Sequence, residues 1–150
     1  MIKFYTSYYA NIKNIPKKCM IVPISLVIPE FIREMSDVTI VKDNFIAPDG
    51  ELLSDIKEGR IGEEEYKTRY VKKICDYING CARFKDLKDW AEAINQYYGT
   101  EYDSICFLCY ERPDEFCHRQ IFSKMLNMYG VHCEELGYKN TENKQKNALW

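Results

Sequence analysis

The sequence contains no long hydrophobic run. None of its apolar stretches approaches the roughly 18 residues that a membrane-spanning helix needs. Its first residues, MIKFYTSYYANIK, also lack the apolar segment of a secretory signal peptide. We therefore expect no membrane partner and a cytoplasmic location.

The sequence also lacks a marked excess of charge of either sign. Its formal net charge is −2 over 150 residues. Proteins that bind nucleic acids by neutralising phosphates usually carry a basic excess, so we do not expect a nucleic-acid partner. With 46% hydrophobic residues, the composition is that of a globular domain with its own core.

The cysteines do not suggest a disulfide framework. There are seven, an odd number, and a chain of this length does not need disulfides to fold. In a reducing compartment we expect free thiols, most of them buried as small hydrophobic side chains.

The sequence does contain an alternation of strand and helix patterns. Apolar, β-branched and aromatic runs predict strands, and helical spacing of apolar residues predicts helices. Pro23 lacks a backbone N–H and predicts a bulge or a strand end. The expected strands are 2–7, 20–26, 104–109 and 131–136. The expected helices are 28–35, 63–79, 84–98 and 114–129, with mostly irregular structure over 36–62.

This alternation indicates an α/β fold with a small, mostly parallel sheet. Right-handed crossovers would place helices on both faces, giving a Rossmann-like three-layer domain. We expect a single domain over 1–137 and a polar, frayed tail over 138–150. In such sheets, ligands bind beyond the carboxyl ends of the strands.

The segment SICFLCYERPDEFCHRQIFSKML, residues 104–126, contains the most informative side chains. Cys106 and Cys109 form a C-x-x-C pattern within an expected strand. Residues three apart on a strand point to opposite faces, so these sulfurs should neither form a disulfide nor share a metal. We therefore expect Cys106 to be a core residue.

A zinc site is a second interpretation of this segment. Cys109, Cys117 and His118 could converge if the intervening loop folds back. However, a structural zinc site usually has four ligands in two closely spaced pairs. Adjacent residues on a helix lie about 100° apart, which makes Cys117 and His118 a poor pair. We therefore predict no metal site and no cofactor.

An anion pocket is the third interpretation. Cys109 ends a strand, and a helix is expected to begin near Asp114 as N-cap, with Cys117, His118 and Arg119 in its first turns. A helix N-terminus and a guanidinium both favour an anion. A thiol in that field should ionise more easily than a free one. Arg119 could equally pair with Glu111 as a structural arginine.

The block FLCYERPDEFCHRQIF resembles the signature of the domain-of-unknown-function family 488. That signature is a strand ending in Leu-Cys-x-Glu, a loop with proline, and Cys-His-Arg at a helix start. Here these are Leu108 to Glu111, Pro113, and Cys117 to Arg119. KFYTSYYANIKNIP, VPISLVIPEF and FIAP resemble further segments of the family. The resemblance implies a compact Rossmann-like domain and supplies no reaction.

The leading hypothesis is a small enzyme that acts on a nucleotide-like or other phosphate-bearing or anionic molecule. Cys117 is the favoured reactive thiol, and His118 would be the general acid or base. The expected catalytic residues are Cys109, Cys117, His118 and Glu111. The expected ligand or anion contacts are Arg119, Arg112, Thr6, Ser7, Tyr8 and Ser25.

Two alternatives remain open from the sequence. The same pocket could bind a nucleotide or another anion without turning it over. Alternatively, Glu111, His118 and Arg119 could form a buried polar network that attaches the last helix to the sheet, with the function elsewhere.

Overall fold

The structure, a computed structural model, describes residues 2–35, 46–81, 87–111 and 115–137. A sheet of four strands lies at its centre, in the order β2-β3-β1-β4, with all strand pairs parallel. The strands are β1 (Lys3–Tyr8), β2 (Cys19–Pro23), β3 (Ser104–Cys109) and β4 (Cys133–Glu135). The expected α/β class with a small parallel sheet is confirmed, whereas the Rossmann-like description stays a prediction.

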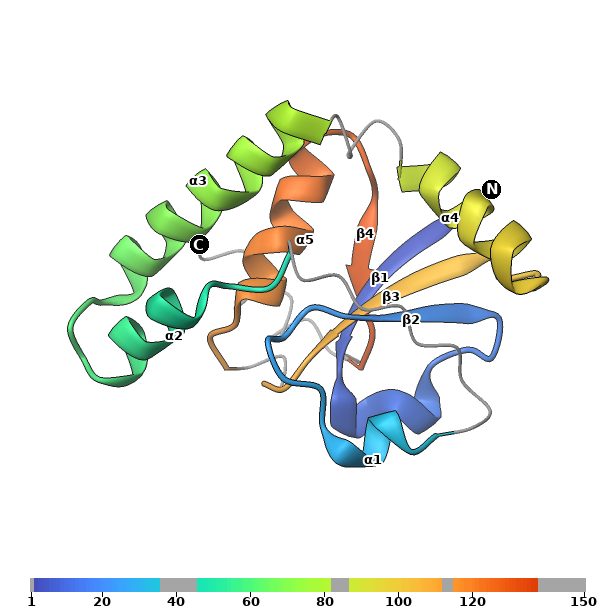
Figure 1. Cartoon of the computed structure of the whole chain (residues 1–150), viewed down its shortest axis with the longest axis horizontal. Coiled ribbons are helices and arrows are strands. Elements are labelled where there is room, and N and C mark those ends of the chain that lie inside the picture. Colours follow the sequence, from blue (N-terminus) through green and yellow to red (C-terminus); the bar gives the residue numbers. More distant parts are fainter. Residues whose placement is uncertain (1, 36–45, 82–86, 112–114, 138–150) are drawn as a thin grey trace.

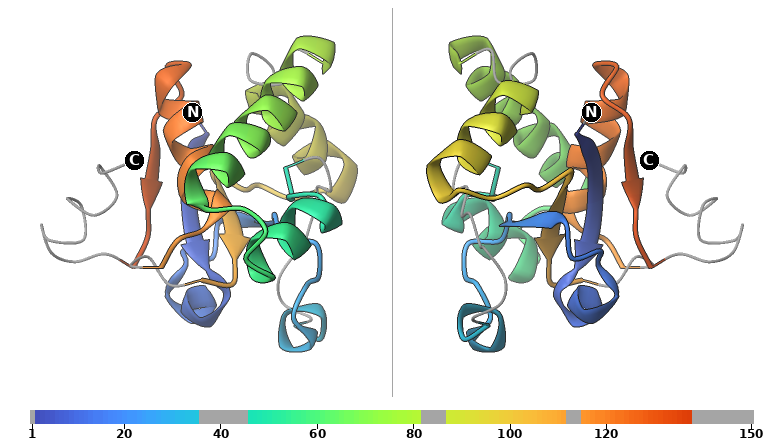
Figure 2. Two further views of the ribbon diagram at one scale, coloured as in Figure 1. Left: turned by 90° about the vertical axis from the view of Figure 1, so that its left-hand side faces the viewer. Right: turned by 90° about the vertical axis from the view of Figure 1, so that its right-hand side faces the viewer.

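Helical segments pack against both faces of this sheet (Figures 1 and 2). Three of them share one core cluster with the strands: α2 (Gly50–Lys57), α3 (Glu63–Cys81) and α5 (His118–Met128). The opposite face is covered by the short 3-10 helix η1 (Tyr9–Asn14) and by α1 (Glu30–Arg33). The remaining helix, α4 (Leu87–Tyr98), precedes β3.

Strand β3 shows why the two cysteines of the C-x-x-C pattern are unrelated. Its side chains alternate between the faces, so Cys109 belongs to the core beside α5 and Cys106 to the core beside η1. Both residues are buried. The prediction that Cys106 is a core residue on the face opposite Cys109 is therefore confirmed.

Strand β2 ends at its proline, one of the two outcomes that the missing N–H of Pro23 predicted, and three residues before the expected end at residue 26. Pro23 is the last residue of the strand and lies opposite Leu108 in the parallel register. One further backbone bond follows, from Ile24 N–H to the Leu108 carbonyl at 2.9 Å. The Ile24 carbonyl lies 2.6 Å from a side-chain nitrogen of α5.

Several sequence-based boundaries are wrong: the strands expected over 20–26 and 131–136 end at Pro23 and Glu135, and the helix expected over 28–35 covers only Glu30–Arg33. Helix α5 begins at His118 with Cys117 as its N-cap, not near Asp114, and residues 115–117 are not helical. Helix α2 covers eight residues of the segment expected to be mostly irregular. It forms because Leu52 and Ile56, four residues apart, pack on the core from one helix face.

Some predictions fall on residues that the structure does not describe. These are the start of the expected helix over 84–98 and the expected tail over 138–150. Within the described ranges, no helix combines the length and apolar character that crossing a membrane requires.

Candidate functional site

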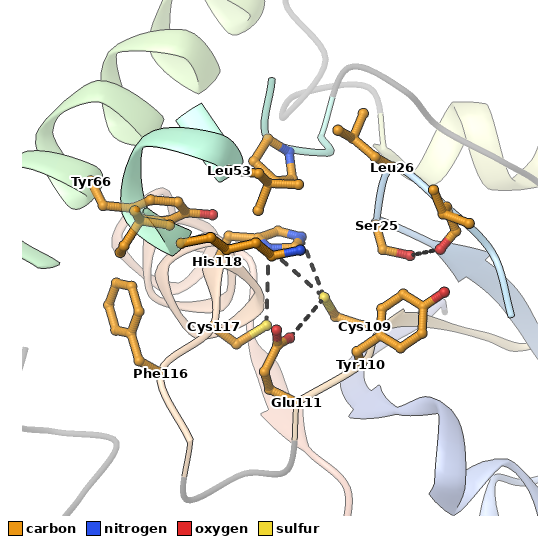
Figure 3. A pocket seen from close by; sticks show the side chains of 14 residues that line it. Ser25, Leu26, Leu53, Tyr66, Cys109, Tyr110, Glu111, Phe116, Cys117 and His118 are labelled. Carbon is orange, nitrogen blue, oxygen red and sulfur yellow. Dashed lines mark hydrogen bonds between the residues drawn. The ribbon is translucent and has the colours of Figure 1, made fainter. Parts of the chain in front are cut away.

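A pocket of about 310 Å³ lies beyond the carboxyl ends of β2 and β3 (Figure 3). This is where ligands bind in parallel α/β sheets. Its walls come from the segments after these two strands, from α2 and α3, and from the start of α5. The lining residues are Ser25, Leu26, Val27, Pro48, Leu53, Ile56, Lys57, Tyr66, Cys109, Tyr110, Glu111, Phe116, Cys117 and His118.

The thiol of Cys109 lies between an imidazole and a carboxylate on the pocket wall. Its Sγ is 3.6 Å from Nε2 and 3.8 Å from Nδ1 of His118. It also lies 3.4 Å from Oε2 of Glu111, which it approaches as a donor (Figure 3). The expected meeting of a thiol, an imidazole and a guanidinium at the strand ends is found only in part: the thiol and the imidazole line the pocket with Glu111 beside them, but Arg119 does not line it.

Two contacts hold the His118 ring in place. Its Nε2 lies 2.6 Å from the Ile24 carbonyl. A carbonyl only accepts, so Nε2 carries the proton and Nδ1 keeps its lone pair. The ring also packs on Tyr70, with centroids 5.5 Å apart. The hydroxyl of Tyr70 donates to the Ile46 carbonyl at 2.6 Å, so the wall behind the imidazole is itself anchored.

Cys117 has a structural role that the sequence did not indicate: it is the N-cap of α5. Its backbone is extended (φ −153°, ψ 143°), and its Sγ accepts the Arg119 N–H at 3.4 Å as the N-cap of α5. Burial raises the pKa of the Cys117 thiol well above its ordinary value. The expectation that this thiol ionises more easily than a free one is wrong, because desolvation, the largest cause of the shift, outweighs the lowering of its pKa by His118.

Arg119 lies outside the pocket lining, in a buried polar network. Its side chain is 0% exposed, and its Nε pairs with Oε1 of Glu135 at 2.9 Å. Its Nη1 donates to the backbone carbonyl of Glu111 at 2.7 Å. The same Oε1 accepts from the Thr6 hydroxyl at 2.8 Å. The acidic partner is therefore Glu135 on β4, not the carboxylate of Glu111.

This network keeps its charges away from solvent. Burial raises the pKa of Glu135, and Arg119 opposes that rise. Within the described residues, Nη2 of Arg119 and Oε2 of Glu135 are buried without a hydrogen-bond partner. The arrangement joins β1, β4 and α5, so Arg119 and Thr6 serve the scaffold here.

The other expected ligand contacts also divide between the pocket and the scaffold. Ser25 lines the pocket, and its Oγ lies 2.5 Å from the Tyr9 hydroxyl. Ser7 is buried and donates to the Leu136 carbonyl at 3.1 Å. Tyr8 does not line the pocket, and its ring packs near Gly137. Arg112 lies outside the described residues.

Several pocket residues were not expected from the sequence. Leu53, Ile56 and Lys57 come from α2, in the segment expected to be mostly irregular. The helical spacing of Tyr66 predicts helix packing; in the structure its ring meets Phe116 edge to face at 5.4 Å. The spacing of Leu52 and Ile56 was the one available signal, and it marks a helix without locating the pocket.

The site also contains a group of potential metal ligands. The ligating atoms of Cys109, Cys117 and His118 all lie within 4.8 Å of one another. The sequence argument against this group placed Cys117 inside the helix. Because Cys117 is instead an extended N-cap, the 100° separation of helical neighbours does not apply to it.

Comparisons with known proteins returned nothing for this chain: no family model, curated protein or solved structure matches it. The resemblance to the domain-of-unknown-function family 488 therefore stays an expectation from the quoted motifs.

Proposed function

We propose that the protein is an enzyme that acts on a small nucleotide-like or otherwise anionic molecule, with Cys109 as nucleophile. The observation that carries this proposal is the position of Cys109 Sγ. It lies on the wall of a pocket, 3.6 Å from Nε2 and 3.8 Å from Nδ1 of His118. Nucleophile and base within hydrogen-bond reach, with the base oriented by a third group, is the arrangement that covalent catalysis requires.

The chemistry follows from these positions. Cys109 Sγ would attack an electrophilic atom of the substrate while its proton passes to Nδ1 of His118. The imidazolium would then return that proton to the leaving group. Water or another acceptor would cleave the covalent intermediate, giving its proton to His118 and restoring the thiol. Glu111 would stabilise the imidazolium.

Cys109 replaces Cys117 as the favoured nucleophile. Cys117 Sγ already accepts a backbone N–H as helix cap, and it lies 4.0 Å from Nδ1 of His118. An attack by this sulfur would release the cap at the start of α5. Cys109 Sγ does not cap a helix, so its reaction would not remove a helix cap.

The pocket walls support a substrate with a flat apolar part and an anionic part. Leu26, Leu53, Tyr66 and Phe116 supply apolar and aromatic surface, against which a base could stack. Lys57 supplies a cation to the lining. It takes over the anion-binding role first expected of Arg119, which is sealed in the scaffold.

A binding module without turnover is the second candidate, since the same walls would hold the same ligand. The third interpretation, a structural network, is favoured for Arg119 by its pairing with Glu135. It does not extend to Cys109, which faces the pocket. We also propose a cytoplasmic location, since the six cysteines whose side chains the structure describes are free thiols.

The test compares the wild-type protein with Cys109→Ser and with Cys75→Ser, a matched control outside the pocket. Each is incubated with a small-molecule extract, which is then profiled by untargeted mass spectrometry. We expect a phosphorylated or nucleotide-like compound to be consumed by wild type and Cys75→Ser and to persist with Cys109→Ser. Brief treatment with iodoacetamide should modify Cys109 before Cys117.

Two results would contradict the proposed enzymatic function. One is turnover that survives Cys109→Ser. The other is a compound that co-purifies unchanged and binds stoichiometrically to both Cys109→Ser and Cys117→Ser, which would identify a binding module instead.

A further inference from the structure

We propose that Cys109, Cys117 and His118 bind a thiophilic divalent cation, Zn²⁺, with a fourth coordination position open to the pocket. The three ligand atoms come from the end of β3 and the start of α5, and all lie within 4.8 Å of one another. Figure 3 shows the two sulfurs and the imidazole turned toward one another.

The spacing of these atoms fits a zinc tetrahedron. With Zn–S bonds of about 2.3 Å and a Zn–N bond of about 2.05 Å, a sulfur and a nitrogen ligand lie roughly 3.6 Å apart. In the structure, Nδ1 of His118 is 3.8 Å from Cys109 Sγ and 4.0 Å from Cys117 Sγ. For these two sulfur–nitrogen pairs, closing to the ideal value needs movements of only a few tenths of an ångström, and the two sulfurs lie within 4.8 Å of each other.

A hydrogen bond already fixes the His118 ring as a metal ligand would require. Its Nε2–H donates to the Ile24 carbonyl, which in the neutral ring leaves the lone pair on Nδ1, 3.8 Å from Cys109 Sγ and 4.0 Å from Cys117 Sγ. Metal-binding histidines usually donate their other ring N–H to a carboxylate, a backbone carbonyl or water, which fixes the tautomer and the ring. The Ile24 contact supplies that support before any ion arrives.

The ligand set selects the class of metal. Two thiolates and an imidazole suit Zn²⁺ and other thiophilic ions, whereas Mg²⁺ and Ca²⁺ require oxygen ligands. The two thiolate charges would neutralise the dication in a wall that Tyr66 and Phe116 make largely apolar. A charge-neutral complex avoids the cost of a buried net charge.

The fourth position distinguishes this site from a structural zinc site. Three protein ligands with a vacant position are typical of catalytic zinc, where water or substrate completes the tetrahedron. Here all three ligands line the pocket, so the vacant position is reachable from it. Glu111 lies 3.4 Å from Cys109 Sγ, close enough to contact a water bound there.

The metal site does not require the proposed thiol chemistry to be correct. The two share Cys109, however, and a coordinated sulfur is not free to attack a substrate. Bound Zn²⁺ would therefore protect Cys109 from alkylation, and this consequence alone depends on Cys109 being reactive.

The experiment uses the full chain, stripped of metal with a chelator and kept reduced. Zn²⁺ is titrated in competition with a chromogenic chelator, and Co²⁺ is added in parallel as a spectroscopic probe. We expect one equivalent of Zn²⁺ and a thiolate-to-cobalt charge-transfer absorption. Cys109→Ser and Cys117→Ser should each weaken binding by more than about 100-fold, the upper limit for loss of an outer hydrogen-bond partner.

The variants keep the result interpretable. Serine is a favoured N-cap, so Cys117→Ser removes the ligand and preserves the start of α5. Cys75→Ser and His132→Gln, at a half-buried cysteine and an exposed histidine outside the cluster, should bind Zn²⁺ as the wild type does.

No stoichiometric Zn²⁺ in the wild type, or binding unchanged in both serine variants, would overturn the metal site. If Cys109 is alkylated and a substrate is consumed while Zn²⁺ does not bind, the proposed enzymatic function is supported and the proposed metal site is refuted. If Zn²⁺ binds through these residues and no compound is turned over, the metal site is supported and the proposed enzymatic function is refuted.

Discussion

His118 and Ile24, 94 residues apart in the chain, are joined by a 2.6 Å hydrogen bond from the imidazole Nε2 to the backbone carbonyl. This contact attaches the first residue of α5 to the end of β2. In the neutral ring, it also leaves the lone pair on Nδ1, which lies within 4.0 Å of both thiols. Both the proposed catalysis and the proposed metal site depend on that tautomer.

Replacing His118 by alanine should lower the free energy of unfolding by about 2 kcal/mol. The change leaves the Ile24 carbonyl without its partner in a buried position and creates a cavity beside Tyr70. Urea denaturation followed by circular dichroism measures the loss. His132→Ala, at an exposed histidine, should change stability by less than about 0.5 kcal/mol. Equal stability of the two variants would show that the Ile24 contact contributes nothing.

Replacing Arg119 by alanine should lower the free energy of unfolding by about 3 kcal/mol, because Glu135 would remain as an unpaired buried charge. Arg60→Ala removes a half-exposed ion pair and should cost less than about 1 kcal/mol. Denaturant unfolding of both variants checks this difference. An Arg119→Ala protein that unfolds like the wild type but loses its ligand would return this residue to the binding site.

The stability of the protein should fall as pH rises above about 9, in part through Cys133. Burial raises the pKa of this thiol to about 12, and the nearby carboxylates of Glu134 and Glu135 add to the rise, while Ser123 opposes it. In the unfolded chain a thiol loses its proton near pH 8.5. Between these values the folded state binds more protons, so this stabilisation is complete below about pH 8.5 and is lost toward pH 12.

Cys133→Val tests this account. It should reduce the fall in unfolding free energy between pH 9 and pH 11 by up to about 1.4 kcal/mol per pH unit, the contribution of one proton. Thermal unfolding of wild type and variant at matched pH values gives the comparison. Parallel curves for the two proteins would assign the alkaline loss to other groups.

Gly137→Ala should destabilise the protein more than Gly59→Ala. Both glycines have positive φ, of 104° and 74°, so each alanine would carry backbone strain. Only at position 137 would the new Cβ meet neighbours, at 3.1 Å from Tyr8 Cε1 and 3.2 Å from Asn11 Nδ2. We expect a cost of about 1–3 kcal/mol at Gly137. A melting temperature lowered equally by both changes would leave the Tyr8 contact without consequence.

Strand β3 was predicted from the sequence with its true boundaries, because a continuous apolar run needs burial on both faces wherever it lies in the fold. The missing N–H of Pro23, also a local property, predicted a bulge or a strand end, and the structure has the strand end there, three residues before the expected bound. Helix α5 shows the limit of such reasoning. Its apolar stripe predicted the helix, but its true start depended on Cys117 Sγ accepting a nearby N–H, which the residue type did not indicate.

By itself, the sequence determined the α/β class, most strands and helices, and the position of Cys109 at a strand end, since periodicity and chain order fix those features. Only the tertiary structure decided that Arg119 pairs with Glu135, that α2 walls the pocket, and that Ile24 sets the tautomer of His118. Each of these is a contact between segments distant in the chain, and the partner depends on how elements pack together and not on any local pattern of residues.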